Sequence, residues 1–310
     1  MYENFLENLK SKKHNFIAKA ISAIENDTEL KTFLLSKIQF KKSTSVRIGI
    51  TGPPGAGKSS ITNKLIKKYR SQNKSVCALL VDPTSPFSNG SVLGDRIRIN
   101  QFYDDKDVFI RSLASRGSKG GLSYEIDTIA DLIDFIGFDI IIIETVGVGQ
   151  IELDVIESVD SVVVVLVPES GDDIQIMKAG LIEIADLYVI NKSDREDADK
   201  LFIILSNMLQ LVKNKKWIPE IIKTVAIENV GIDELYKNLE NHKKYLLDSD
   251  GLDFKNNKRF IKKIKNEIVK NFEDSFWTCN RLNFMEDFFK KKKIQKISLS
   301  SIIKKLKEIS

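Results

Sequence analysis

Short, unbroken runs of apolar residues alternate with longer amphipathic stretches through the middle of the chain. Six of the runs are rich in β-branched residues and have the length of a strand, at residues 46–51, 76–82, 138–144, 161–167, 187–191 and 221–226. Runs without polar alternation are typical of strands covered on both faces. The intervening stretches, such as 122–136 and 174–185, have helical length and periodicity. The pattern therefore predicts an α/β fold with a doubly wound, mostly parallel sheet.

Turn-forming residues are confined to the same central region. Of the 16 glycines, 15 lie between Gly49 and Gly231, and all six prolines lie between Pro53 and Pro219. The flanks consequently read as helices with few breaks. We expect an N-terminal helical extension at 1–44, an α/β domain at 45–245 and a helical C-terminal region at 246–310.

The net charge of +5 is unevenly distributed, because residues 241–310 alone carry +9. We favour a solvated helix surface over nucleic-acid or membrane binding for this tail, since no nucleic-acid motif accompanies the charge. No apolar stretch reaches 18 residues and the N-terminus has no signal-type apolar core. Only two isolated cysteines, Cys77 and Cys279, are present. A cytoplasmic protein without a disulfide scaffold is the expectation.

The first apolar run leads into a glycine-rich loop, and this strand–loop–helix context predicts a phosphate-binding P-loop. Its glycines allow backbone amides to point at nucleotide phosphates, and the following helix directs its positive end at the same anion. Lys58 would add charge at the outer phosphates, and the Ser59 hydroxyl would ligate Mg²⁺. The predicted nucleotide-binding residues here are Gly52, Pro53, Pro54, Gly55, Ala56, Gly57, Lys58, Ser59 and Ser60.

The fifth run ends in Asn191-Lys192-Ser193-Asp194, a second chemical signal. A carboxylate such as that of Asp194 can accept two hydrogen bonds from guanine N1–H and its exocyclic amine, whereas adenine offers no matching donor pair. We therefore predict GTP and GDP as ligands. Asn191 would tie this loop to the P-loop, and the aliphatic stem of Lys192 would cover the base. By position alone, a backbone amide of Val225, Ala226 or Ile227 would meet guanine O6.

Acidic residues follow other strands at the same predicted sheet edge. Glu144 closes the most apolar run, where it could hold Mg²⁺ directly or through water, and the amide of Gly147 could contact the γ-phosphate. Asp82 and Asp95 are further candidates for the metal site. Surface solvation or helix capping would equally explain these two aspartates.

Several longer motifs occur together in a characteristic order. They are Asp82-Pro83-Thr84-Ser85, residues 90–98, Phe109-Ile110-Arg111-Ser112, residues 144–150 and residues 191–194. In these motifs the chain resembles the MeaB-type GTPases, the group that also bears the name ArgK and includes the human methylmalonic aciduria type A protein. The resemblance covers about residues 45–245 densely and both flanks more loosely.

The resemblance implies a GTP-binding and GTP-hydrolysing chaperone of an adenosylcobalamin-dependent acyl-CoA mutase, typically methylmalonyl-CoA mutase, gating cofactor loading, protection or reactivation. It implies a metal shell of Ser59, Asp82, Asp95 and Glu144, switch segments at 90–98, 144–150 and 169–178, and a homodimer formed by the C-terminal helices. A cobalamin adenosyltransferase is a further implied partner. We expect no cobalamin on this chain, because no Asp-x-His-x-x-Gly motif is present.

Hydrolysis should be slow without a partner, because Val148, not glutamine, follows Gly147. Lys58 and Asp95 would serve the reaction directly, with Arg98 or Lys178 as a hypothetical charge-stabilising group engaged by partner docking. Three rival readings remain at this point, of which one is a basic-tailed scaffold whose GTP site is only structural. A metal-insertion GTPase would usually carry His or Cys clusters, and only His14 and His242 exist here. A P-loop kinase would need an acceptor site, for which no motif is found.

Overall fold

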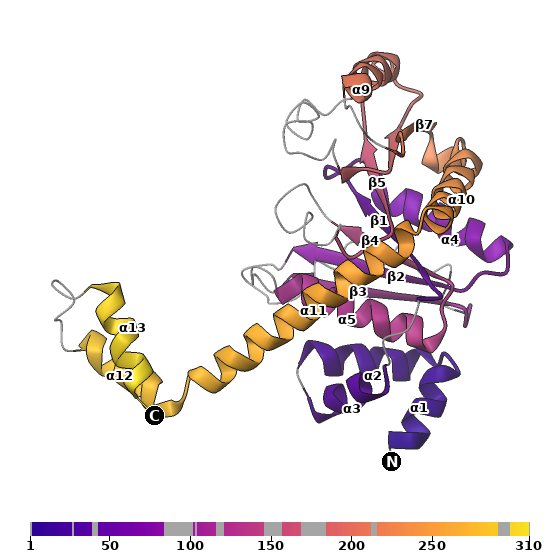
Figure 1. Cartoon of the computed structure of the whole chain (residues 1–310). Coiled ribbons are helices and arrows are strands. Elements are labelled where there is room, and N and C mark those ends of the chain that lie inside the picture. The colour runs from indigo at the N-terminus through magenta and orange to yellow at the C-terminus, as the bar shows by residue number, and fades with distance from the viewer. Residues whose placement is uncertain are drawn as a thin grey trace. The chain divides into compact units, whose positions relative to one another are not determined.

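The computed structural model describes residues 2–26, 28–38, 43–83, 102, 104–115, 121–145, 157–168, 184–211, 216–290 and 298–309. They belong to two compact units, Met1–Arg259 and Phe260–Ser310 (Figure 1). The helix predicted at 174–185 lies outside the described residues except for its last two positions.

Within its described part, the first unit contains a seven-stranded sheet in which all neighbouring strands are parallel. The spatial order is β3-β2-β4-β1-β5-β6-β7. The strands are β1 (Val46–Thr51), β2 (Val76–Pro83), β3 (Val108–Ser115), β4 (Ile140–Thr145), β5 (Ser161–Leu166), β6 (Leu187–Asn191) and β7 (Glu220–Thr224). The predicted doubly wound sheet is confirmed.

The strand order reverses at β1, which lies between β4 and β5. In such sheets, ligands bind outside the carboxyl ends of the strands at the point of reversal. Glu144 lies at this carboxyl edge, since it pairs in register with Ile50 of β1 and Leu80 of β2. All residues of β1 and β4 are buried, as expected for strands covered on both faces.

Helices cover both faces of the sheet. On one face, α4 (Lys58–Ser71) and α10 (Ile232–Asp248) share an apolar core that includes Ile61, Leu65 and Leu235. The other core contains residues of α5 (Gly121–Ile136) and α9 (Ala198–Leu211). Residues of the N-terminal helices join this second core, and these helices are α1 (Tyr2–Lys10), α2 (His14–Glu25) and α3 (Glu29–Lys37).

The edge strand β3 is the one described strand that the hydrophobic pattern did not predict. It pairs with β2 along its whole length, from Val108 to Ser115. Its sequence interrupts the apolar run with Arg111, whose guanidinium donates to Ser22 Oγ and Glu25 Oε2 of α2, each at 3.1 Å. An ion pair with the N-terminal helices therefore replaces the apolar residue that a buried strand would usually carry there.

Polar residues gather at the amino ends of β5 and β6, and we call Asp160, Ser161, Asp186, His242, Lys255 and Arg259 the amino-edge cluster. The two oxygens of Asp160 accept from Arg47 N–H and from Arg259 Nη2, both at 2.8 Å. Asp160 and Arg259 are 1% and 6% exposed. A buried carboxylate is tolerated only when it is paired and hydrogen-bonded in this way.

His242 lies at the centre of the amino-edge cluster and is almost completely buried. Its Nδ1 is 2.7 Å from Ser161 Oγ, and its Nε2 is 3.3 Å from Asp186 Oδ1. Burial lowers the pKa of His242 below its usual value of 6.5; Lys255 also lowers it, while the nearby carboxylates of Asp186 and Asp160 oppose the shift. A neutral imidazole with its proton on Nε2 satisfies both neighbours.

The second unit is helical where the structure describes it. The helix α11 (Gly251–Phe276) begins in the first unit and continues into the second, followed by α12 (Cys279–Lys290) and α13 (Leu299–Glu308). Arg281 joins the three helices, because Nε donates to Leu306 O at 2.8 Å and Nη1 to Phe276 O at 2.6 Å. None of the helices in the described part of the chain has the length and apolarity to cross a membrane.

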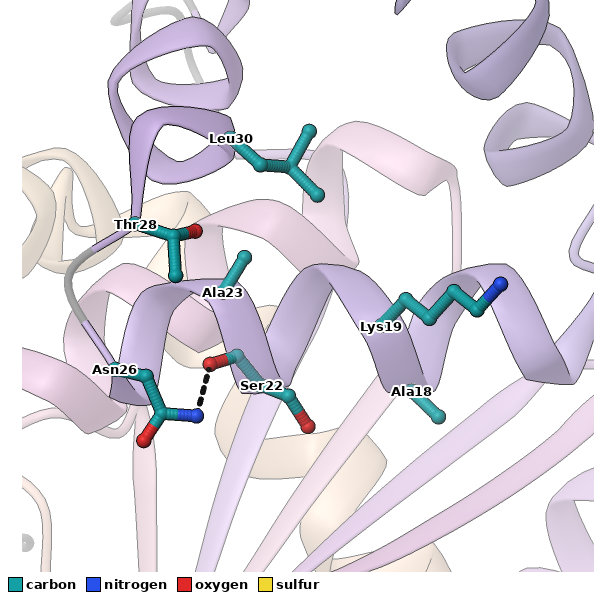
Figure 2. A pocket seen from close by; sticks show the side chains of 7 residues that line it. All are labelled: Ala18, Lys19, Ser22, Ala23, Asn26, Thr28 and Leu30. Carbon is teal, nitrogen blue, oxygen red and sulfur yellow. Dashed lines mark hydrogen bonds between the residues drawn. The ribbon is translucent and has the colours of Figure 1, made fainter.

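An open hollow of about 450 Å³ lies between α2 and α3, and Figure 2 shows the side chains that line it. Within it, Asn26 Nδ2 donates to the Ser22 carbonyl at 2.9 Å. None of the residues predicted to bind nucleotide lines this hollow; its lining is Ala18, Lys19, Ser22, Ala23, Asn26, Thr28 and Leu30. The candidate site therefore has to be sought at the carboxyl edge of the sheet.

Candidate nucleotide site

The glycine-rich loop connects β1 to α4 and takes a conformation that side chains would block. Gly57 has φ 89°, and a Cβ there would lie 2.2 Å from Asn191 Nδ2. A Cβ on Gly52 would lie 2.1 Å from the Val165 carbonyl oxygen. Both contacts are far below van der Waals distance. Glycine at these positions therefore lets the loop pack against β5 and β6 at the carboxyl edge.

Lys58 begins α4 and turns its side chain back into the loop. Its Nζ donates to the carbonyl oxygens of Gly52 at 2.8 Å and Pro53 at 2.9 Å, and the residue is only 6% exposed. On the outer part of the loop, Pro54 and Gly55 are exposed. The ammonium group thus lies inside the curve of the loop at a helix N-terminus, an arrangement that attracts anions.

Ser59, Thr62 and Glu144 form a hydroxyl–carboxylate cluster behind the loop. Ser59 Oγ donates to Glu144 Oε1 and Thr62 Oγ1 donates to Glu144 Oε2, both at 2.6 Å. Glu144 is 3% exposed. Hydroxyl and carboxylate oxygens are the donors that Mg²⁺ prefers, with phosphate oxygens and water completing its octahedron. The donors at this point therefore fit a Mg²⁺ ion held next to the P-loop.

Asn191 links three loops at the same edge. Its Nδ2 donates to the Ala56 carbonyl of the P-loop at 2.8 Å, as the sequence predicted. Its Oδ1 accepts from Thr224 Oγ1 at 3.0 Å and from Ala226 N–H at 3.1 Å. One buried amide thus fixes the phosphate-binding loop relative to both loops predicted to meet the base.

A backbone hydrogen bond joins the two loops that are predicted to bind the base. Lys192 has φ 57°, which turns the chain so that Ser193 N–H donates to the Thr224 carbonyl at 3.1 Å. Asp194 then lies exposed. In the neighbouring loop, Val225 and Ala226 are buried, whereas Ile227 is 79% exposed. An exposed carboxylate on one of these loops and an exposed apolar side chain on the other could recognise the edge and cover the face of a planar base.

Comparison with known proteins agrees with this geometry. The sequence profile of the family described as methylmalonyl Co-A mutase-associated GTPase MeaB matches residues 17–280. The chain belongs to the MeaB family of GTPases. The match includes the P-loop, Glu144 and the Asn191–Asp194 motif, and it extends beyond them into the N-terminal helices and the C-terminal unit.

Relatives of this MeaB-family GTPase include archaeal, bacterial and mammalian proteins. A protein of Pyrococcus horikoshii named as a GTPase is 44% identical, with 86% of each chain covered. The GTPase ArgK of Escherichia coli is 34% identical over 80% of this chain and 77% of its own. The mouse methylmalonic aciduria type A homolog, mitochondrial, is 35% identical over 76% and 58%, respectively.

A solved structure described as LAO/AO transport system kinase resembles this MeaB-family chain in fold. Its TM-score is 0.69 at 24% identity, covering 99% of this chain and 96% of the other. At that identity the likeness supports the fold only, and the reaction has to be argued from the site.

Several predicted site residues of this MeaB-family protein fall outside the described residues, namely Asp95, Arg98, Gly147 and Lys178. Asp82 is described only through its backbone, which pairs with Ala114 near the end of β2. The structure brings together Lys58, Ser59, Glu144 and Asn191 around the P-loop. Metal and catalytic roles for the other residues stay predictions.

The roles of two residues of the site, Thr62 and Thr224, were not predicted from the sequence. Thr62 follows Ser59 by three positions, so helical spacing places both hydroxyls on one face of α4. That spacing was a usable signal. Thr224 ends β7 and donates to Asn191 across 33 positions of sequence, for which no local pattern exists.

Proposed function

We propose that this MeaB-family GTPase is a chaperone of an adenosylcobalamin-dependent acyl-CoA mutase of the methylmalonyl-CoA mutase type. GTP binding and hydrolysis would gate loading of adenosylcobalamin, protection of the mutase or its reactivation. The family description and the name of the mouse relative support the choice of partner. The observation that carries the GTP-dependent part is the hydrogen bonding of Ser59 to Glu144 and of Asn191 to Ala56.

In the proposed mechanism, Lys58 and the P-loop amides would bind the phosphates, while Ser59 and Glu144 would hold Mg²⁺, with Asp82 and Asp95 contributing to its shell. When bound, Mg²⁺ neutralises charge on the phosphate oxygens. Asp194 selects guanine by accepting from N1–H and the exocyclic amine. The amide of Gly147 would contact the γ-phosphate, and Arg98 or Lys178 would stabilise the developing charge once the partner docks. Intrinsic hydrolysis would be slow because Val148, not glutamine, follows Gly147, and docking of the partner would supply the missing order.

The second unit supports the proposed homodimer. Along α11, the exposed residues Ile268 and Phe272 lie beside a hollow of about 410 Å³ that Val269, Phe276 and Trp277 also line. Glu273 also lines this hollow, but its lining is otherwise apolar, and a hollow of this kind on a helical unit fits the same helix of a second copy. Cobalamin would reside on the mutase, a cobalamin adenosyltransferase would be a further partner, and the location would be the cytoplasm, without membrane or nucleic-acid binding.

Phosphate release from GTP, measured with and without purified methylmalonyl-CoA mutase, tests the proposal. The mutase should accelerate release, and Lys58→Ala should reduce it by about 100- to 1000-fold in both conditions. Asp194→Asn should shift preference from GTP toward xanthosine triphosphate, because an amide donates where the carboxylate accepted. Transfer of labelled phosphate to an acceptor instead of water would favour a kinase. If the mutase does not change the hydrolysis rate, the proposed chaperone role is refuted, whereas the assignment as a GTPase still stands.

A further inference from the structure

Thr62 is a buried hydroxyl that the mechanism above does not use. It lies on α4, three residues after Ser59, and is 2% exposed. A threonine inside a helix commonly donates to a carbonyl of the preceding turn. Here the hydroxyl instead reaches across to Glu144 Oε2 of β4, at 2.6 Å. Its hydrogen bond therefore joins the helix that follows the P-loop to the strand that carries the acid.

The two hydroxyls hold the carboxylate of Glu144 from both sides. Ser59 donates to Oε1 and Thr62 to Oε2, each at 2.6 Å, a length typical of hydroxyl hydrogen bonds to a charged oxygen. One such bond would still allow the carboxylate to rotate about its last torsion, whereas one bond to each oxygen fixes its plane. Threonine in a helix divides mainly between two χ1 rotamers, which limits the positions that the Thr62 hydroxyl can take.

The roles of the two hydroxyls differ by position. Ser59 is next to Lys58 and half-buried, so its oxygen can donate its proton to Glu144 and still accept a metal ion through its lone pairs. Thr62 lies about one turn after Ser59 on α4, farther from the P-loop, where its buried neighbours include Ile61, Leu65 and Ile66. Thr62 therefore acts on the carboxylate without reaching the phosphate side of the loop.

We propose that Thr62 is a positioning residue for Mg²⁺: by holding Oε2 of Glu144, it directs Oε1 toward Ser59 and the metal. This inference rests on the proposed binding of Mg²⁺ and guanine nucleotide at the P-loop. Residues that orient a metal ligand typically contribute 10- to 100-fold to metal affinity. Removing the Thr62 hydroxyl should therefore weaken Mg²⁺ binding while guanine recognition through Asn191 and Asp194 persists.

The test measures how Mg²⁺ slows release of a fluorescent GDP analogue from the full-length protein. For Thr62→Val, which keeps the shape and removes the hydroxyl, the Mg²⁺ concentration giving half the effect should rise about 10- to 100-fold. Release in excess EDTA should match the wild type. Thr62→Ser should restore most of the Mg²⁺ response. Ser161→Ala, which removes a buried hydroxyl from the amino-edge cluster, is the matched control and should keep the wild-type response.

A wild-type Mg²⁺ response in Thr62→Val, or an equal defect in Thr62→Ser, would overturn the proposal. If Thr62→Val does not fold, Thr62→Ala tests the same loss with a smaller side chain. Failure of the proposed function would look different, because the wild-type protein itself would then bind no GDP analogue or show no effect of Mg²⁺.

Discussion

Charged side chains are buried at both edges of the sheet, but the groups that contact these side chains differ between the two edges. At the amino edge, Asp160 contacts Arg259 and Asp186 contacts Lys255, so opposite charges meet directly. At the carboxyl edge, hydroxyl groups donate to Glu144 and carbonyl oxygens accept from Lys58. Hydrogen bonds to hydroxyl and carbonyl groups such as these can be exchanged for contacts with metal or phosphate at modest cost, whereas a buried ion pair resists separation. The first edge serves stability, and the second is suited to a ligand.

The largest effect is expected from Arg259→Met at the amino edge. It leaves the buried Asp160 carboxylate without its cation and should lower the free energy of unfolding by about 3–5 kcal/mol. GTP hydrolysis per folded molecule should not change. Urea unfolding and phosphate release measure the two quantities. Lys258→Met removes a neighbouring exposed ion pair with Glu157 and should cost little. A hydrolysis defect that persists when folding is complete would break the comparison.

Lys58→Ala should have the opposite profile. Losing the cation at the P-loop should reduce the hydrolysis rate by about 100- to 1000-fold, in the range found when one preorganised donor to a developing charge is removed. The free energy of unfolding should fall by about 1–3 kcal/mol, less than for Arg259→Met, because the carbonyl oxygens of Gly52 and Pro53 lose this donor. Lys67→Ala, an exposed lysine on the same helix, provides the control. A loss of stability as large as that of Arg259→Met would contradict the view that the amino edge stabilises the fold while the carboxyl edge binds the ligand.

Asn191→Ala should affect both properties, because this residue joins loops and serves the site. It leaves Ala56 O and Ala226 N–H without their partner, which should lower the free energy of unfolding by about 1–3 kcal/mol. If the loss of these hydrogen bonds weakens the free energy of GDP binding by about 1.4 kcal/mol, GDP affinity falls about tenfold. Calorimetric titration and urea unfolding test this, with the exposed Asn207→Ala as control. Unchanged affinity would assign Asn191 to folding alone.

The smallest effect concerns pH and His242. Because burial holds its folded-state pKa below 6.5, the unfolded chain takes up the proton first as the pH falls. The His242 contribution is therefore complete above about pH 6.5 and declines below it. Unfolding free energies compared between about pH 7.5 and about pH 5.5 should fall more for the wild type than for His242→Gln. Equal declines in the free energy of unfolding of the two proteins would show that other groups determine the pH dependence in this range.

The fold was largely predictable because central strands of a parallel sheet are marked by continuous apolar runs. Ile140–Ile143 and Val162–Val165 are such runs, and both are buried strands. The pattern failed at β3, an edge strand in which Arg111 pairs with Glu25. There the tertiary partner, distant in sequence, makes a charged residue compatible with a strand.

The candidate site was predictable where its chemistry is local. The P-loop and the Asn191–Asp194 motif are each an unbroken stretch of sequence, and the structure brings the two together through Asn191 and Ala56. Thr62 and Thr224 could not be assigned with the same ease, because the role of a hydroxyl depends on what lies opposite it. The bond between Thr62 and Glu144 spans 82 positions, and no property of either residue alone reveals it.

The hydrogen bond from Asn191 to Ala56 joins residues 135 positions apart. During synthesis, the P-loop therefore emerges from the ribosome long before the amide that holds it in place. Until β6 has been made and has joined the sheet, the Ala56 carbonyl lacks this donor. The pocket is completed late, so capture of a nucleotide by a growing chain would report that most of the first unit has already folded.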